Sequence, residues 1–433
     1  IIILVSHISC LCINFIKEMN HLKYSFLLAF SFCNITTFFA QNDLSLTLFL
    51  SSASQQKNVQ IANQNLEFQS GQDAELPWIQ ELEFRTETND FILKQQEYTV
   101  RVSPNTKRQR NAQMAFYQAT TELSKMEREL VLKNALFLRY EWLVEWMKIE
   151  QSLEQKTILK VIYNDKLVVL KRSMGDLNFK VKDLVKAEED LLELDSKVRI
   201  LTDKKARLLS TFQYLTGANN QLALDKKTLI TTTQILDKIE FRTLDSTNSL
   251  ALNRKQKRIE ILDKKAEIEW SEIYNPIRYA QIKGGGNADD FREFVSIGLG
   301  VKLPLKGDKK MNLNELNLEK FEESGEYILL KEKLEYKQQQ LIERLNQLIL
   351  QQEYLAQQIK NSQATFLLNK LLETDDSNPL DILDLKEIIV KKEQNLEQFD
   401  LHILQLYVEW LAISNKMMER PFRNHLVNEP SFF

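Results

Sequence analysis

Few side chains of this sequence combine a type and a spacing that could do chemistry. Beyond residue 40 the chain has two histidines, His402 and His425, and no cysteine. Metal centres built from histidine and cysteine need about three or four such ligands, so this part of the chain predicts no metal site. His402 falls beside apolar positions of an expected helix, which indicates a packing role. The sequence therefore predicts neither a metal site nor catalysis.

The glycines do not indicate a cofactor site either. Gly298 and Gly300 lack the third glycine and the following helix start of a nucleotide-binding loop. The run Gly284–Gly286 is better explained as a turn. We expect no cofactor.

Asp381 and Asp384 are two carboxylates whose spacing permits a joint role. They lie three residues apart near the start of an expected final helix, so they share one helical face. Negative charge near a helix start is also favoured by the helix dipole. The residues alone leave two roles open for Asp381 and Asp384. Together they could attract cations, or each could only stabilise the start of the helix.

Composition predicts long helices. The chain has 433 residues with only 10 glycines and 7 prolines, whereas ordinary domains use about 7% glycine and 5% proline. The net charge is -3, and no basic stripe is interleaved with aromatic residues, so a nucleic-acid partner is not expected.

Residues 1–40 are expected to be a targeting region. The chain starts at Ile1, and Met19 opens a secretory signal with Lys23 before an apolar run and a cleavage point after Ala40. Residues 1–18 would then precede the true start. The alternative is a membrane anchor, but neither apolar run reaches the roughly 20 residues of a spanning helix. A cut after Ala40 would remove all three cysteines, so the mature chain would hold no disulfide.

One stretch in this helical chain alternates as a strand does. From Phe294 to Leu305, every second side chain is apolar, and residues on the other face are small or polar. Pro304 removes a backbone donor and ends the strand. A strand with one apolar and one polar face fits a lipid-facing barrel wall or an edge strand of a small soluble sheet. The expected apolar face is Val295, Ile297, Leu299, Val301 and Leu303.

The sequence contains an internal repeat. In each half two strands lie between prolines, Pro77 and Pro104 in the first and Pro276 and Pro304 in the second, at offsets of 199 and 200 residues. Long helices follow, over 107–171 and 310–372. Gly175 ends the first, a further helix covers 182–215, and a final helix runs to about 418. We expect repeats over 41–235, with a connector, and 236–420, then a tail over 421–433.

Four strands are too few to close a membrane barrel, because the smallest barrels have about eight. An open sheet edge cannot face lipid, where its backbone groups find no water. If the strands cross a membrane, the protein must therefore be an oligomer. The alternative is a soluble four-stranded sheet that joins two antiparallel coiled coils.

The order of these elements resembles the TolC-type outer-membrane efflux family over the whole chain from Gln41 to about Met418. The motifs are 295–305, Leu380–Leu385 before a seam that ends near Trp410, and Asp183–Glu188 with Leu215–Gly217 in the first repeat. The resemblance implies a mainly α fold of two tandem coiled-coil hairpin repeats. It also implies a homotrimer with a twelve-stranded β-barrel in the outer membrane and a helical tunnel in the periplasm. Such proteins are passive ducts that dock on a periplasmic adaptor and an inner-membrane transporter.

The resemblance also implies roles for single residues. Asp381 and Asp384 match acidic positions that narrow the periplasmic end of the pore, Gly175 marks a hairpin tip, and Asp183 matches an acidic gate partner. The stretch 372–377 lacks the tyrosine, glycine and arginine of the usual latch, so a different closure is expected. The competing function is a soluble periplasmic coiled-coil adaptor or scaffold.

Overall fold

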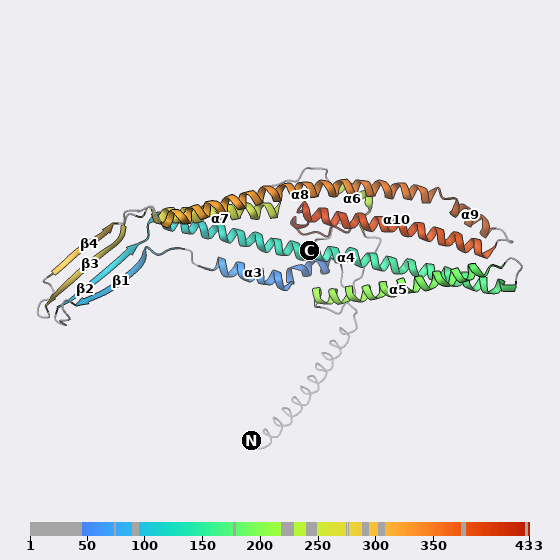
Figure 1. Cartoon of the computed structure of the whole chain (residues 1–433), viewed down its shortest axis with the longest axis horizontal. Helices are drawn as coiled ribbons and strands as arrows, with labels where there is room; N and C mark the ends of the chain where they lie inside the picture. Colours follow the sequence, from blue (N-terminus) through green and yellow to red (C-terminus); the bar gives the residue numbers. More distant parts are fainter. Residues whose placement is uncertain are drawn as a thin grey trace, which may run out of the picture.

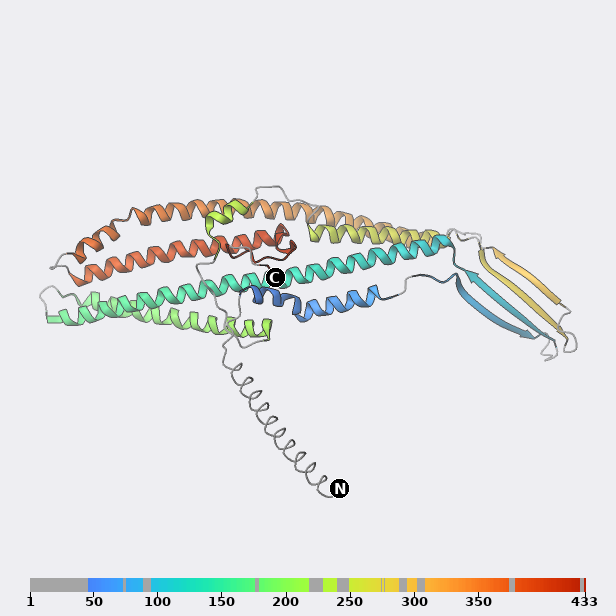
Figure 2. The ribbon, with the colours of Figure 1, turned by 180° about the vertical axis from the view of Figure 1, so that it is seen from behind.

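The computed structural model is an elongated molecule with a small sheet at one end and long helices over the rest (Figures 1 and 2). It describes residues 46–72, 75–88, 95–175, 179–217, 229–239, 249–273, 275, 277–287, 294–301, 308–373, 378–428 and 432–433. The targeting region expected over 1–40 lies outside these residues, as do Pro276, Leu303 and Pro304. Among the described helices, none is long and apolar enough to cross a membrane.

The sheet has four antiparallel strands in the order β1-β2-β3-β4. They are β1 (Ile79–Thr88), β2 (Gln95–Pro104), β3 (Ile277–Asn287) and β4 (Phe294–Val301). Each expected repeat contributes one pair, and β2 and β3 join the two pairs. Gly284–Gly286 were expected in a turn, but they belong to β3, because they pair with Gln96, Glu97 and Tyr98 of β2.

The first half continues as a helical hairpin. After α2 (Leu46–Ser51), η1 (Ser52–Gln55) and α3 (Lys57–Ser70), the sheet leads into α4 (Lys107–Arg172), η3 (Ser173–Gly175) and α5 (Val181–Thr216). Thr106 and Gln109 form a capping box that satisfies free backbone donors at the start of α4. Gly217 ends α5 in a left-handed conformation, φ 67°, which glycine adopts without strain.

The second half repeats this layout with one difference. Its elements are α6 (Thr232–Lys238), α7 (Leu250–Ile273), α8 (Asp308–Lys360), α9 (Gln363–Leu372), α10 (Pro379–Ile413) and η6 (Lys416–Met418). The single helix expected over 310–372 is wrong. Ser362 has extended backbone and its side chain caps α9, so the chain breaks between α8 and α9. The expected division between residues 235 and 236 falls inside α6, and the domain limits stay a prediction.

The core lies midway along the helices, where both ends of the described chain pack on α4. The rings of Phe49, Trp142, Trp146 and Phe212 contact one another there, with centroids 5.1 to 5.3 Å apart, and Trp142 and Trp146 are stacked. Arg139 is fully buried beside them and donates to Ser52, Gln56 and the carbonyls of Ala135 and Leu215. These bonds tie the segment around Ser52 and Gln56 to α4 and α5, and in the described part of the chain Arg139 has no acidic partner.

Candidate functional site

The apolar side chains of the sheet form one continuous exposed face. Val295, Ile297, Leu299 and Val301 of β4 are 68%, 84%, 64% and 61% exposed. The register extends this face across all four strands. Ile297 of β4 pairs with Ile282 of β3, which pairs with Val100 of β2, and the row ends at Phe84 of β1. A second row contains Leu82, Val102, Ala280 and Leu299. The shared exposed face expected for the β4 residues is therefore observed for the four that are described.

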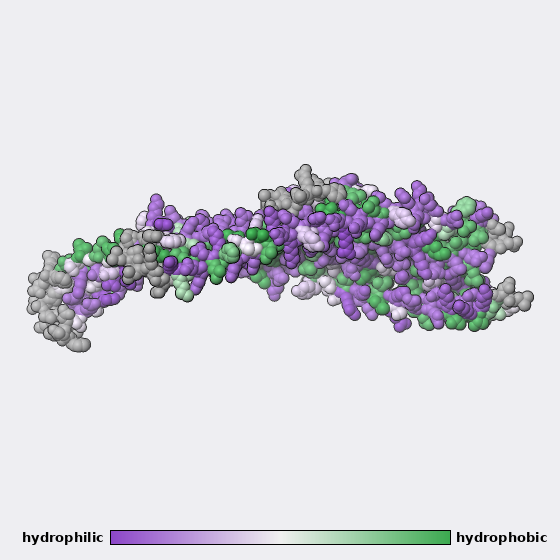
Figure 3. All heavy atoms as spheres, turned by 45° about the horizontal axis from the view of Figure 1, so that its top comes forward, coloured by the Kyte–Doolittle hydropathy of each residue, from purple (hydrophilic) through white to green (hydrophobic). Residues whose placement is uncertain are grey.

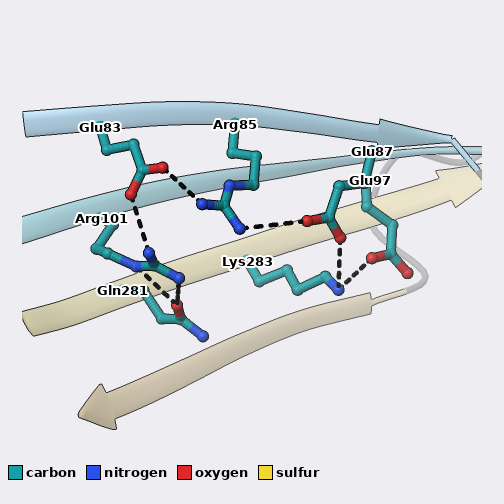
Figure 4. Close-up of polar contacts among 7 residues, drawn as sticks. All are labelled: Glu83, Arg85, Glu87, Glu97, Arg101, Gln281 and Lys283. Atoms are coloured by element: carbon teal, nitrogen blue, oxygen red, sulfur yellow. Dashed lines mark hydrogen bonds and ion pairs between the residues drawn. The ribbon is translucent and has the colours of Figure 1, made fainter.

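The opposite face of the sheet carries a ladder of ion pairs (Figure 4). Glu83 of β1 pairs with Arg85 at 2.8 Å and with Arg101 of β2 at 2.9 Å, and Arg101 also donates to Gln281 of β3. Lys283 of β3 pairs with Glu97 of β2 and lies 3.9 Å from Glu87 of β1. Opposite charges on neighbouring strands stabilise one another as cross-strand pairs. A face with so many charged side chains is expected to contact water and not lipid. In the space-filling view, apolar and hydrophilic residues gather on different sides of this end (Figure 3).

The glycines of β4 allow side chains of β3 to lie flat on this polar face. A Cβ atom at Gly300 would lie 2.5 Å from the ring of Tyr279, and one at Gly298 would lie 3.0 Å from Gln281. The Arg101 guanidinium in turn stacks on the Tyr279 ring at 4.3 Å. Gly298 and Gly300 thus make room for close side-chain packing between β3 and β4.

Two hydrogen bonds and one cation–ring contact connect the sheet to the helices. Asn105 donates from its side chain to the Pro77 carbonyl and from its backbone to the Trp78 carbonyl, both at 2.8 Å. The Arg110 guanidinium stacks on the Trp78 ring at 3.4 Å. Pro104 ends β2 opposite Ile79. The described prolines therefore mark the point where the sheet changes into helix.

At the far end of the molecule, Asp381 and Asp384 occupy the start of α10 and are both exposed. Asn378 caps this helix, and Asp381 lies in its first turn, where the helix dipole favours negative charge. Asp384 contacts Lys166 of α4 at 2.5 Å. The two carboxylates share a helix start, but in the described residues Asp384 has a cation partner.

Gly175 and Asp183 lie at the tip of the first hairpin. Gly175 ends η3, with nothing within 4 Å of the position of a Cβ atom, and Asp183 lies exposed in the first turn of α5. Within the described chain, no ion pair of Asp183 is found. The structure does not bring Asp183 together with Asp381 or Asp384.

One contact between the two hairpins is a cluster around Lys166 that the sequence did not predict. Lys166 of α4 is 12% exposed and pairs with Asp384 and Glu387 of α10. Glu387 also accepts hydrogen bonds from Tyr163 at 2.8 Å and Lys391 at 2.5 Å. Burial opposes ionisation, but the bonds from Lys166, Lys391 and Tyr163 outweigh it and lower the pKa of Glu387 to about 2.

A signal for this cluster exists in the sequence. Lys166 interrupts the apolar seam of α4 between Tyr163 and Leu167, which are both buried. Glu387 lies three residues after Asp384, on the same helical face. A lysine within the apolar seam of one helix and acids on the seam of its partner helix indicate an ion pair. The pattern can be recognised only when it is known which two helices pack together.

Comparison with solved structures identifies the fold. The chain is similar to the outer membrane protein VceC from Vibrio cholerae, with 10% identity, 84% and 95% of the two chains covered and a TM-score of 0.62. It is also similar to CusC, with 11% identity, 86% and 92% coverage and a TM-score of 0.63. The MtrE outer membrane channel of Neisseria gonorrhoeae matches with 12% identity, 85% and 88% coverage and a TM-score of 0.54.

No protein-family model and no curated protein matches the chain. At these low identities the structural matches establish the fold alone. They cover most of this chain and nearly all of each neighbour, so the single-chain fold expected from the TolC-type resemblance, long helices with a small antiparallel sheet, is confirmed.

Proposed function

We propose that this protein is the outer-membrane channel of an export system, a passive duct with no catalytic activity. One observation carries the proposal: a sheet with an exposed apolar face, an ion-paired polar face and two open edges lies beyond the ends of the helices. Helix α4 has 66 residues, which is about 100 Å at 1.5 Å per residue. Such a length suits a tunnel that continues from a membrane barrel.

The sheet edges require further strands. The outer edges of β1 and β4 have no partner strand in the described chain, and an unpaired edge cannot face lipid. Three copies would close a twelve-stranded barrel with the apolar rows outside and the ladder of Figure 4 inside. Two copies would give eight strands, so the open edges alone do not set the number of copies. We propose a homotrimer because the TolC-type resemblance implies three copies.

The edge helices of the wall support assembly with further copies. On α5, Ala187, Leu194 and Phe212 are buried against the chain, whereas Val181, Val185 and Leu192 are exposed on the opposite side, at about 100° per residue. Helix α8 shows the same arrangement, with Leu341 and Leu345 buried and Met311, Leu318, Leu329 and Tyr336 exposed. A helix with two apolar faces belongs between two others, so α5 of one copy would pack on α8 of the next.

The structural neighbours favour the same location. VceC and MtrE are described as an outer membrane protein and an outer membrane channel, and CusC is described as forming a transmembrane channel. We assign this chain to the outer membrane, with its helical end in the periplasm. There it would meet a periplasmic adaptor and an inner-membrane transporter, as the family resemblance implies.

The helical tip would form the closed end of the duct. Asp381 is the freer of the two expected pore carboxylates, because Asp384 contacts Lys166. We therefore place the cation preference mainly on Asp381, with Asp384 and Glu387 holding α10 against α4. Asp183 would have at most a secondary role in the gate.

Recording from the purified protein in planar bilayers tests this function. Step-like conductance with cation preference is expected, and Asp381→Asn should weaken the preference more than Asp183→Asn. The duct is contradicted if the mature protein purifies without detergent as a periplasmic monomer and gives no conductance. That result would favour the soluble adaptor.

A further inference from the structure

A cavity of about 860 Å³ lies in the middle of the helical wall, between α4, α5, α8 and α10, with α6 across it. Binding sites for small molecules have volumes of about 300–1,000 Å³. The cavity lies away from both the sheet and the acidic tip. Its lining begins at Trp146 on α4, which leaves the sheet at Lys107, and at Glu397 on α10, which starts at Pro379. The duct function does not account for it.

One wall of the cavity is apolar and aromatic. Trp146, Met147, Leu401 and Leu404 line it. The Trp146 ring stacks on Trp142, with centroids 5.3 Å apart, and the Lys205 ammonium lies 5.3 Å from the Trp146 centroid. A cation within about 6 Å of an indole face is attracted by its electron density. The chain thus already places one cation on this ring.

The remaining walls carry an excess of negative charge. Glu150, Glu353, Glu397 and Asp400 line the cavity together with a single ammonium group, that of Lys205. Lys205 pairs with Glu150 at 2.6 Å. The other three carboxylates have no cation partner in the described part of the chain.

Asp400 is held in place by neutral groups. It accepts hydrogen bonds from Thr232 of α6 at 3.1 Å and from Gln352 of α8 at 3.0 Å. Burial raises the pKa of Asp400, and the hydrogen bonds from Thr232 and Gln352 offset only part of this rise. A half-buried carboxylate whose hydrogen-bond donors are neutral is stabilised by a cation that enters the cavity.

We propose that this cavity binds an amphipathic organic cation, such as a lipophilic quaternary ammonium or phosphonium ion. The apolar wall would receive its hydrocarbon part, and Asp400, Glu397 and the Trp146 face would receive its charge. A metal ion fits less well, because no group of three or more metal-ligating side chains is found among the described residues. The inference does not rest on the duct function.

The test is equilibrium dialysis of tetraphenylphosphonium against the purified full-length protein in a nonionic detergent. Saturable binding is expected, and neutral triphenylphosphine oxide should bind much more weakly. Asp400→Asn keeps the shape and the acceptor oxygen but removes the charge, and it should weaken binding about tenfold. Glu409→Gln, which removes a carboxylate outside the cavity, should leave the affinity unchanged.

A second variant is expected to tighten binding of the cation and not to weaken it. Lys205→Met removes the competing ammonium from Trp146 and Glu150, so binding should tighten by about threefold or more. This expectation holds even if Asp400→Asn does not fold. Equal binding of the cation and the neutral compound, or weaker binding by Lys205→Met, would overturn the proposal.

Discussion

Lys166 joins α4 to α10 near the helical tip through ion pairs. It is nearly buried and bonds to two carboxylates on the other hairpin. Removing one partner of a buried ion pair leaves the other charge without compensation, which costs more than the intact pair contributes. The cluster therefore acts as a clamp between the two halves of the chain.

Replacing Lys166 tests this clamp. Lys166→Met should destabilise the α4–α10 contact by about 2 kcal/mol, because Glu387 then stays buried without its main cation. Hydrogen exchange of α10 amides around Glu387 measures the local opening. Lys166→Arg, which keeps the charge, is the matched control. Equal exchange in the Met variant and the native protein would show that packing alone holds the tip.

The clamp should respond to acid in a defined range. The pKa of Glu387 is lowered from 4.5 to about 2 in the folded protein, so its ionised form stabilises the fold above pH 4.5. That stability is lost as the pH falls from about 4.5 to about 2. Exchange at the tip, corrected for its intrinsic pH dependence, should be constant from pH 7 to 5 and rise below 4.5. A rise already near pH 6 would point to another group.

At the scale of elements, β4 depends on the absence of side chains at two positions. Tyr279 lies on Gly300 and Gln281 lies on Gly298, so each glycine accommodates a neighbour from β3. The two contacts differ in stiffness, because an aromatic ring cannot fold away from an added methyl group as a glutamine side chain can. This difference gives a matched pair of substitutions.

Gly300→Ala should destabilise the sheet by about 1–3 kcal/mol through overpacking against the Tyr279 ring. Gly298→Ala should have a smaller effect. The measurement is the temperature at which the assembled protein dissociates. The double variant Gly300→Ala with Tyr279→Ser should regain most of the loss. If both single variants melt alike, the ring contact does not govern this strand.

Most elements were predictable because their signals are local. Proline boundaries and alternation predicted β1, β2 and β4, and apolar seams predicted α4 and α5 within one or two residues. The final helix was expected to reach about 418, but α10 ends at Ile413 and η6 follows it. The break at Ser362 was not predictable, since no glycine or proline marks it and the seam continues on both sides. The Lys166 cluster was missed because it depends on which helices pair, whereas Asp381 and Asp384 could be named from one helix alone.

At the scale of the whole molecule, the proposed assembly makes the chain one segment of a closed wall. Both outer strands and both outer helices present surfaces suited to another copy. Head-to-tail contacts of this kind close into a ring when the rotation between copies permits it. The assembly, and not the single chain, would then bury the exposed stripe of α5.

Leu192→Lys tests the helical part of this interface. Leu192 is 71% exposed in the single chain, and a lysine there would be buried between copies at a cost of several kcal/mol. Loss of the trimer in analytical ultracentrifugation is expected. Lys204→Glu, exposed on the same helix but outside the stripe, should remain assembled. A fully assembled Leu192→Lys protein would place the interface elsewhere.

The central claim is that one face of the sheet contacts lipid while the other faces water, and spin labelling in membranes tests it most directly. Single cysteines replace Val295, Ser296, Ile297, Leu299 or Gln281 in the mature chain, because the sequence has no cysteine beyond residue 40. Labels at Val295, Ile297 and Leu299 should be accessible to lipid-dissolved oxygen, and labels at Ser296 and Gln281 to a water-soluble nickel chelate. Equal access of the nickel chelate to all five positions would contradict the membrane barrel.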